Sequence, residues 1–542
     1  MMSVSYLYKV MAILYKVIIE GCKGGIFLIT NKEAAKVAVV GAGPGGLAAA
    51  MLLAAKGYNV EVYEKQAVVG GRSGQLQLGD YRFDRGATFL MMPHLLEELF
   101  ASAGRSLNDY ITLHELDPLY SLHFGDTVFT PSPNQDQTEA EIEKLFPGNG
   151  QGYRRFMNDE ADKFDRVMPL LQRPFQSAGD YVKKDVLRAL PKLHATDTVY
   201  NRLSKYFDDE RLRYAFTFQA KYLGMSPWEC PGTFTILSYL EHKYGLCHPE
   251  GGIHRIFEAM AKVITEHGGA VHTSCGVKKV LVQKGQAAGL LLENGEKVEA
   301  DYVIMGADFG SAMTQLFEPG VLKRYTPEKV ARKRYSCSTA MLYLGVNSKV
   351  ELGHHSVHFA EDYRLNVDEI TRLGTLSADA SIYIHNPSVL DPTLAPPGKS
   401  SLYMLMPVPN LQADIDWEEM GPSVQAEMLE RLQRVTGINN LNQRIEESLF
   451  FSPMDWRNKL DVYNGATFNL AHNLGQMMYL RPHNTFQEVG GIWLVGGGTH
   501  PGSGLPTIFE SAKISARLLE EHDRTARSQM VAAGFSGKGI SL

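Results

Sequence analysis

Four glycines and an acid near the start of the sequence have the types and spacing of a dinucleotide-binding site. Gly41, Gly43 and Gly46 follow a short valine-rich run in a G-x-G-x-x-G spacing, with Gly45 between them. The first glycine allows a tight turn, the second lets a pyrophosphate approach the backbone, and the third lets a helix pack on the strand. Glu64 ends a second apolar run, near the offset of about 20 residues at which a carboxylate binds the adenosine ribose. An acid at this point favours an unphosphorylated ribose, so the unit predicts FAD or NAD.

A pattern just downstream concerns the choice between these two cofactors. Gly70, Gly71 and Arg72 stand in "VVGGRSGQ". A guanidinium there can pair with two pyrophosphate oxygens, and the glycines admit a close approach of the backbone. Arg72 on its own would equally suit a surface ion pair. Next to the preceding unit, however, "GGR" resembles the signature of FAD-dependent amine oxidases and carotenoid desaturases, and this resemblance favours FAD.

A second glycine-rich turn, "IWLVGGGTHPGSGLPTIFESAK", lies near the C-terminus. It also reads as strand, turn and helix, but no strand and acid follow it, so it cannot complete an independent dinucleotide unit. We expect Gly497, Gly504 and Leu505 beside the same cofactor, with a helix that begins near Pro506. The free N–H groups of Leu505 and of residues 507–509 would face the flavin. A helix N-terminus there would stabilise the negative charge of the reduced flavin by about 0.3–2 kcal/mol, depending on burial.

The order of the expected strands and helices predicts an α/β fold. It consists of a Rossmann-like FAD-binding domain with an inserted α+β substrate-binding domain, and these elements position the residues above. Helical patterns dominate the first insertion, and alternating strands in the second predict an antiparallel sheet with helices on one side. The expected segments are 1–34 as an N-terminal extension, 35–105, 248–308 and 487–522 as FAD-binding domain, 106–247 and 309–486 as substrate domain, and 523–542 as a frayed tail.

Individual elements are also predicted. We expect a helix over 253–267, a strand over 270–282, a hairpin at "ENGE", a strand at "YVIMGAD" and a helix near 423–435.

Composition excludes several classes of protein. The 542 residues carry a net charge of −6, which argues against a nucleic-acid binder, and a mean hydropathy of −0.17 excludes a polytopic membrane protein. Five scattered cysteines without a C-x-x-C favour a reduced, cytoplasmic compartment. No histidines have zinc-type spacing, and the adjacent His354 and His355 cannot both face one ion from a strand, so the sequence predicts no metal site.

The first residues, "LYKVMAILYKVIIEGCKGGIFLIT", are apolar but interrupted by Lys9, Lys16 and Lys23. They suit either an amphipathic membrane anchor or an overlong start and disordered leader. The second interpretation is favoured.

The sequence resembles the bacterial phytoene desaturases (phytoene dehydrogenases), including diapophytoene desaturases and oxidases, within the amine oxidase-like flavoproteins. The resemblance runs from about residue 36 to 519 and includes "FDRGAT" with Asp84 and Gly86, "LDVYNGATFNLAHNLGQMMYLRPHN" and "GGGTHPGSGLPTIFESAK". It implies a GR2-type flavoprotein with FAD as cofactor and the backbone of Val277 at the adenine. It also implies flavin-dependent removal of hydrogen from a long, apolar C30 or C40 polyene.

The resemblance places two catalytic candidates near the flavin. His500 could accept the proton released after hydride transfer, although a structural histidine bonded to the turn backbone fits equally well. Arg481, with His483, could shape the flavin site, and a buried ion pair is the alternative. Asp455 and Glu510 are weaker candidates.

The partners expected on this basis are a carotenoid or isoprenoid substrate, the cytoplasmic membrane surface, and a quinone or oxygen as electron acceptor. Met91 and Met92 could line an apolar channel that opens toward the bilayer. The alternatives left open are a carotenoid oxidase or isomerase, an amine oxidase-like flavoenzyme, and a non-catalytic flavin-binding membrane protein.

Overall fold

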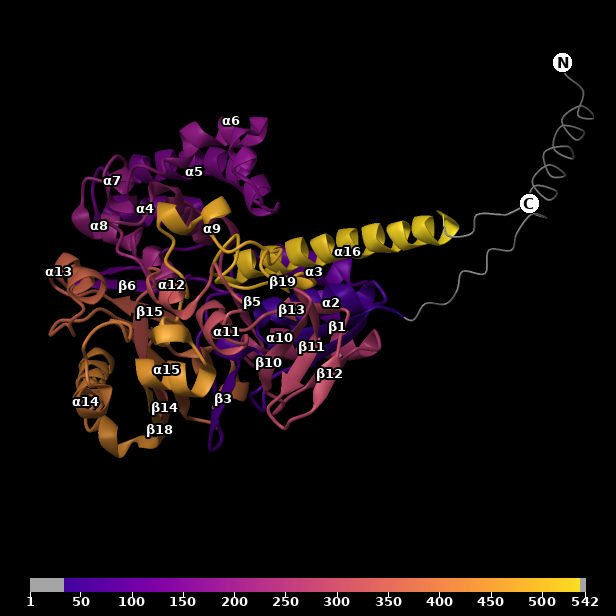
Figure 1. Cartoon of the computed structure of the whole chain (residues 1–542). Coiled ribbons are helices and arrows are strands. Elements are labelled where there is room, and N and C mark those ends of the chain that lie inside the picture. Colours follow the sequence, from indigo (N-terminus) through magenta and orange to yellow (C-terminus); the bar gives the residue numbers. More distant parts are fainter. Residues whose placement is uncertain (1–33, 537–542) are drawn as a thin grey trace, which may run out of the picture. The chain divides into compact units, whose positions relative to one another are not determined.

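The first glycine motif lies at the centre of a five-stranded parallel sheet, in the computed structural model that describes residues 34–536 (Figure 1). The strand order is β19 (Ile492–Leu494), β13 (Tyr302–Met305), β1 (Lys36–Val40), β2 (Asn59–Tyr63) and β9 (Ala270–His272). All four strand pairs are parallel, and β1 is buried except at its first residue. Valine-rich strands of this kind suit a sheet that is covered on both faces.

Helices pack on one face of this sheet and a small second sheet packs on the other. The helices are α2 (Pro44–Ala55), α3 (Pro93–Ser102), α10 (His254–Glu266) and α16 (Leu505–Ser536), which share one apolar core. The small sheet contains β10 (Val277–Gln283), β11 (Gln286–Leu292) and β12 (Lys297–Glu299), all antiparallel. This arrangement confirms the predicted Rossmann-like domain.

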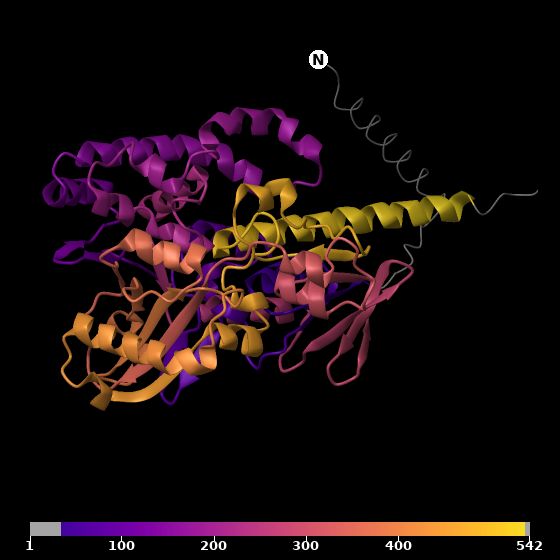
Figure 2. The same ribbon diagram turned by 60° about the vertical axis from the view of Figure 1, so that its left-hand side comes forward.

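A seven-stranded sheet forms the centre of the inserted part. Its order is β18 (Ile445–Phe451), β14 (Ser338–Val346), β17 (Ser400–Val408), β16 (Ile382–His385), β15 (His355–His358), β6 (Ser121–Phe124) and β7 (Thr127–Phe129). The neighbouring strands are antiparallel except for β15 and β6, which are parallel and come from different insertions. Helix α14 (Trp417–Thr436) covers one face, as Figure 2 shows, so the prediction of a sheet with a helix on one side is confirmed.

A layer of helices completes the inserted part (Figure 1). It contains α4 (Gln135–Leu145), α5 (Gly150–Leu171), α6 (Lys184–Leu193), α7 (Val199–Leu203), α8 (Glu210–Ala215) and α9 (Ile236–Tyr244), around an aromatic-rich core. The other regular elements are β3 (Gln75–Leu78) paired with β4 (Tyr81–Asp84), β5 (Leu113–Glu115) paired with β8 (Cys247–Pro249), α11 (Phe309–Gln315), α12 (Pro327–Ala331), α13 (Tyr363–Asp368) and α15 (Pro453–Leu460).

Two predicted elements differ from the structure. The expected strand over 270–282 divides into β9 and β10, which belong to different sheets, because Ser274 between them has a φ of 51° and turns the chain. The expected frayed tail is helical as far as Ser536. Within it, the Asp523 carboxylate accepts hydrogen bonds from the hydroxyls of Tyr58 and Tyr302, so the helix is still docked on the FAD-binding domain at this point.

Other predicted elements are confirmed with shifted bounds. The helix expected over 253–267 is α10, the hairpin at "ENGE" joins β11 and β12, and α14 begins earlier than expected, at the Asp416 cap. From Lys36 onward the chain forms one compact unit, so the domain boundaries stay a prediction. In the described part of the chain, no helix has the length and apolar character needed to cross a bilayer. The apolar N-terminal stretch lies outside the described residues.

Candidate functional site

The first glycine turn has the geometry that dinucleotide binding requires. Gly41 has a φ of 89°, which favours glycine, and a Cβ at Gly46 would lie 2.2 Å from the Gly41 carbonyl oxygen. Gly43 caps the N-terminus of α2, where no side chain accepts a hydrogen bond from the first turn, and a Cβ there would meet nothing within 4 Å. The N-terminus of α2 is therefore open to an anionic group.

Glu64 holds this turn in place. One of its carboxylate oxygens accepts a hydrogen bond from the Ala42 N–H at 2.7 Å, and the other accepts one from the Gln66 N–H at 2.8 Å. Burial raises the pKa of this carboxyl group, and the two backbone N–H groups act in the opposite direction. Each oxygen can accept a further hydrogen bond, so Glu64 is placed to receive a ribose hydroxyl as well.

Arg72 reaches across to the end of strand β13. Its guanidinium donates to the Asp308 carboxylate at 2.7 Å and to the Thr467 carbonyl at 2.8 Å. The same carboxylate group accepts from the Asn469 amide and from the N–H groups at the start of α11. Sequence reasoning missed Asp308, although its place in "YVIMGAD", at the carboxyl end of a parallel strand, was a usable signal.

The two glycine-rich turns lie against each other. A Cβ added at Gly45 would come within 3.1 Å of the Gly496 nitrogen and 3.3 Å of the Ile508 side chain. Helix α16 therefore begins directly beside the N-terminus of α2, as expected from the sequence. Its Ile508 N–H is used inside the helix, since it donates to the Gly504 carbonyl, so the expectation that this group faces the flavin is wrong.

A buried histidine positions the second turn. The Ser503 N–H donates to Nε2 of His472 at 3.1 Å, and the Ser503 hydroxyl donates to the Phe468 carbonyl at 2.6 Å. Burial keeps the pKa of His472 well below its usual value, so the ring stays neutral and Nε2 can accept. A Cβ at Gly502 would lie 2.6 Å from the same nitrogen, which explains the glycine. Nothing in the local sequence indicated this contact.

One large cavity connects the two turns with the seven-stranded sheet. Its volume is about 640 Å³. Every predicted cofactor residue lines it except Gly46, which packs behind the turn. The lining members are Gly41, Gly43, Gly45, Glu64, Gly71, Arg72, Val277, Gly497, Gly504, Leu505 and Pro506.

The cavity has two chemically different sections. Its charged lining residues all belong to the dinucleotide-binding segments, except for Asp461. Asp461 forms an ion pair with Lys65, which is part of those segments. Beyond the turns the lining is uncharged and mainly apolar. Its side chains come from the loop after β4, the 3-10 helix Phe218–Leu223, α9 and the β15–β17 strands: Phe89, Met91, Phe218, Leu237, Leu240, Val357, Ile382, Tyr383, Tyr403 and Leu405. The first section suits a charged cofactor and the second a hydrocarbon.

The residues present fit FAD. Two uncapped glycine turns, the carboxylate of Glu64 and the guanidinium of Arg72 provide donors and acceptors for a pyrophosphate and a ribose. The Thr467 hydroxyl is buried at the same cavity and has no hydrogen-bond partner within the described chain, as expected for a group that awaits a ligand.

Arg481 does not line this cavity. It is fully buried and donates to five backbone carbonyls, those of Leu470, Ala471, Gln476, Gly497 and Thr499. Burial lowers its pKa to about 9. These contacts tie the second glycine turn to the preceding loop, so they support a positioning role and give no support to a catalytic one.

His500 is also placed behind the turn. Its Nε2 donates to the Arg173 carbonyl at 2.9 Å, its ring packs edge-on against Phe175, and burial lowers its pKa to about 4. It is absent from the cavity lining, so the structural alternative agrees better with its contacts.

His483 and the two weaker candidates have other partners. His483 donates to the Tyr479 carbonyl. Asp455 completes the capping box of α15 by accepting from the Ser452 N–H, and Glu510 pairs with Lys513.

Comparison with known proteins identifies the family. Residues 44–519 match the flavin-containing amine oxidoreductase family. The chain belongs to this family. It is an FAD-dependent oxidoreductase. One relative of the flavoenzyme, a 4,4'-diapophytoene desaturase (4,4'-diapolycopene-forming) from a Methylomonas species, is 43% identical over 90% of this chain and 96% of the relative.

A zeta-carotene-forming phytoene desaturase from Myxococcus xanthus is 36% identical over 91% of the flavoenzyme and 94% of the relative. The resemblance to carotenoid desaturases is therefore confirmed. Among solved structures, putrescine oxidase has a TM-score of 0.58 at 14% identity and covers 91% of this chain and 99% of its own. At that identity it shows only that the fold is shared.

Proposed function

We propose that this flavoenzyme desaturates a long, apolar carotenoid precursor such as phytoene or 4,4'-diapophytoene. The observation that carries the proposal is the continuous cavity, whose second section is lined by uncharged and mostly apolar side chains. A hydrocarbon chain can enter such a section without desolvating an ionic group. The relatives at 43% and 36% identity are named as desaturases of these two types of precursor.

Side chains in the two sections of the cavity have different roles. FAD, when bound, supplies the acceptor for a hydride. Glu64 and the N-terminus of α2 hold the ribose and pyrophosphate end, and the N-terminus of α16 lies where it can stabilise negative charge. Leu237, Ile382 and their apolar neighbours exclude water from the reacting carbons. Tyr383 keeps its proton, because burial raises its pKa well above the usual value.

We further propose that the enzyme binds the membrane surface peripherally on the cytoplasmic side, where such substrates dissolve. An exposed apolar strip supports this: the side chains of Val182, Leu187 and Leu190 at α6 are 70%, 50% and 45% exposed. Lys183 and Lys184 lie beside it. Exposed apolar side chains flanked by lysines are typical of helices that lie in the headgroup region. Figure 1 places α6 at the outer edge of the helical layer.

The membrane proposal has a direct test. The double variant L187E/L190E should lose binding to vesicles of phosphatidylglycerol and phosphatidylcholine, while keeping its flavin. The matched control is L365E/L373E, which changes two leucines that are 50% and 52% exposed in and after α13. Equal loss of vesicle binding in both variants, or loss in neither, would contradict a docking site at α6.

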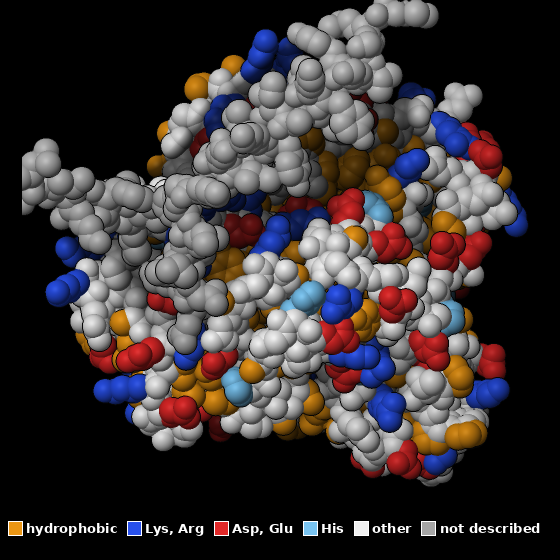
Figure 3. Space-filling model, turned by 90° about the vertical axis from the view of Figure 1, so that its right-hand side faces the viewer, with side chains coloured by type: hydrophobic (Ala, Val, Ile, Leu, Met, Phe, Trp, Pro, Cys, Tyr) orange, Lys and Arg blue, Asp and Glu red, His pale blue; other side chains and the backbone are white. Residues whose placement is uncertain are grey.

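The remaining partners follow from the substrate. We propose a quinone in the membrane or oxygen as the electron acceptor. We expect no nucleic acid among the partners, because the net charge is −6 and, on the face shown in Figure 3, the basic side chains are interspersed with acidic ones.

Pigment analysis tests the substrate class. The gene is expressed together with a C30 or a C40 precursor synthase, and the carotenoids are extracted. The proposal predicts products with longer conjugation than the precursor in one of the two hosts. An oxygenated product would indicate a carotenoid oxidase, an isomerised product without net oxidation would indicate an isomerase, and unchanged precursor in both hosts would refute the substrate class.

A further inference from the structure

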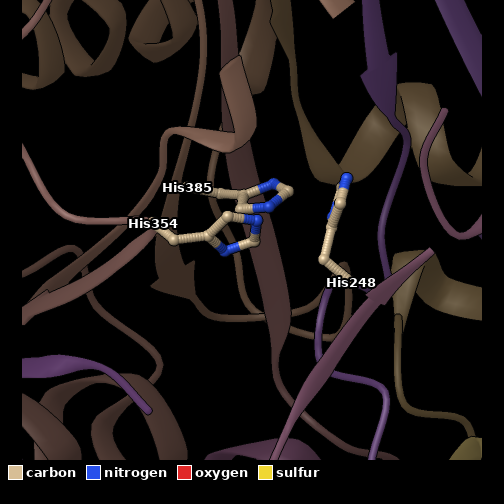
Figure 4. A group of neighbouring side chains, drawn as sticks. All are labelled: His248, His354 and His385. Atoms are coloured by element: carbon tan, nitrogen blue, oxygen red, sulfur yellow. The ribbon is translucent and has the colours of Figure 1, made fainter. Parts of the chain in front are cut away.

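Three histidines from distant parts of the sequence meet beside the seven-stranded sheet. His248 lies in β8, His354 directly precedes β15, and His385 ends β16. One ring nitrogen of each lies within 4.8 Å of those of the other two. Figure 4 shows the rings of His354 and His385 next to each other and that of His248 across from them.

Five of the six ring nitrogens in this cluster have no hydrogen-bond partner within the described chain. They are Nδ1 of His248 and both ring nitrogens of His354 and of His385, and all are buried. His248 and His385 are each 1% exposed. Buried polar atoms are normally paired, so this cluster suits a ligand that accepts several lone pairs at once.

A carboxylate fixes the orientation of His248. Its Nε2 donates to Asp391 at 3.0 Å, which leaves Nδ1 to act as the acceptor atom of this ring. The Asp391 carboxylate is itself held by the Gly251 N–H at 2.6 Å and by the N–H and hydroxyl of Thr393. A histidine whose other nitrogen donates to a fixed carboxylate is the usual arrangement around protein-bound zinc.

We propose that His248, His354 and His385 bind one divalent first-row transition-metal ion, with Zn²⁺ as the first candidate. Three imidazoles and one open position are a common ligand set for zinc. Zinc–nitrogen bonds of about 2.0–2.1 Å place tetrahedral ligands roughly 3.4 Å apart, so the rings must close in only slightly from their present separation of at most 4.8 Å.

The ion ties two parts of the fold together at the substrate cavity. It links β8, which leads into α10 of the FAD-binding domain, to the ends of β15 and β16 in the seven-stranded sheet. Next to His354 in the chain, Nδ1 of His355 lies 2.7 Å from the hydroxyl of Tyr383, which lines the cavity. A metal ion held here would therefore stabilise the cavity wall.

Sequence spacing could not reveal this cluster. The prediction of no metal site considered the neighbours His354 and His355, and they indeed do not act together: only the first belongs to the cluster. Its partners are more than 100 residues before it and about 30 after it along the chain, which no short motif covers.

Metal analysis of the flavin-loaded enzyme tests the proposal. The protein is dialysed against excess Zn²⁺, passed through a desalting column and analysed for zinc by mass spectrometry. We expect about one zinc per chain in the wild type, as for a three-histidine site, and a melting temperature that falls when a strong chelator is added. The variants H354Q and H385Q should lose the zinc and the chelator effect, and D391N should weaken zinc binding by about 10–100-fold.

The matched control is H358Q, which changes a buried, unpartnered histidine nitrogen on β15 outside the cluster. It should keep one zinc. If H385Q does not fold, H354Q and D391N decide, because His354 is only half-buried and Asp391 does not touch the ion. A wild type that retains no zinc, or variants that retain as much as the wild type, would overturn the proposal.

Discussion

Replacing Glu64 by glutamine should weaken flavin binding without unfolding the protein. The carboxylate accepts hydrogen bonds from two backbone N–H groups, Ala42 and Gln66, at 2.7 and 2.8 Å. An amide has one oxygen, so in E64Q one of these donors faces an NH₂ group and loses its acceptor. These two bonds exist with and without FAD, so the affinity changes through the ribose hydroxyl, which would lose its charged acceptor in E64Q. A hydrogen bond to a charged group contributes about 1.5–3 kcal/mol, and each 1.4 kcal/mol is a factor of ten in affinity. The dissociation constant for FAD should therefore rise roughly 10- to 150-fold.

Titration of the flavin-free protein measures this effect. FAD fluorescence is quenched on binding, and the ratio of flavin to protein absorbance reports how much cofactor survives purification. The matched control is E61Q, because Glu61 lies on β2, which Glu64 directly follows, but is more exposed and bonds to the Tyr63 hydroxyl instead of the glycine turn. An E64Q protein that binds FAD as tightly as the wild type, or an E61Q protein that loses FAD equally, would refute the reasoning.

Three further predictions concern the cavity and the buried histidines. H500Q should change the rate of flavin reduction less than about threefold, since His500 bonds to the Arg173 carbonyl behind the turn; a loss in the 10²–10⁴ range of a general base, with normal flavin content, would restore its catalytic role. L237E should lower turnover at least about tenfold, because it puts a charge into the apolar section; unchanged turnover with a full complement of flavin would contradict the cavity assignment. His242 is buried and its pKa is lowered to about 3, so the unfolded chain binds a proton between pH 6.5 and 3 that the folded chain does not. Stability should therefore rise with pH over this range, and in H242Q the slope from denaturant unfolding should fall by about 1.4 kcal/mol per pH unit; an unchanged slope would contradict the burial of this ring.

The parts of the site that depend on local sequence could be predicted. Gly41, Gly46 and Glu64 act through a strand, a turn and a helix that are neighbours in the chain, so their spacing reveals their roles. The same holds for the start of α16, where glycine and proline mark the turn.

The parts that depend on contacts between distant segments could not. His472 bonds to Ser503, Arg72 bonds to Asp308, and Gly45 packs against Gly496. In each case, the sequence of one segment does not indicate which distant segment it will contact. The motif around Arg481 indicated a functional residue. Its five carbonyl partners come from loops that meet only in the folded protein, so the sequence could not indicate them. The sequence did not predict the helix after Asp523, because its mostly polar residues give no apolar pattern that would indicate packing and so resemble a frayed end.

Anaerobic mixing of the oxidised, flavin-loaded enzyme with 4,4'-diapophytoene or phytoene in lipid vesicles tests the central claim most directly. Desaturation predicts that the flavin absorbance near 450 nm is lost while a more conjugated carotenoid appears, one new double bond for each flavin reduced. A flavin that stays oxidised with both polyenes, although the enzyme carries its full complement of FAD, would contradict the account.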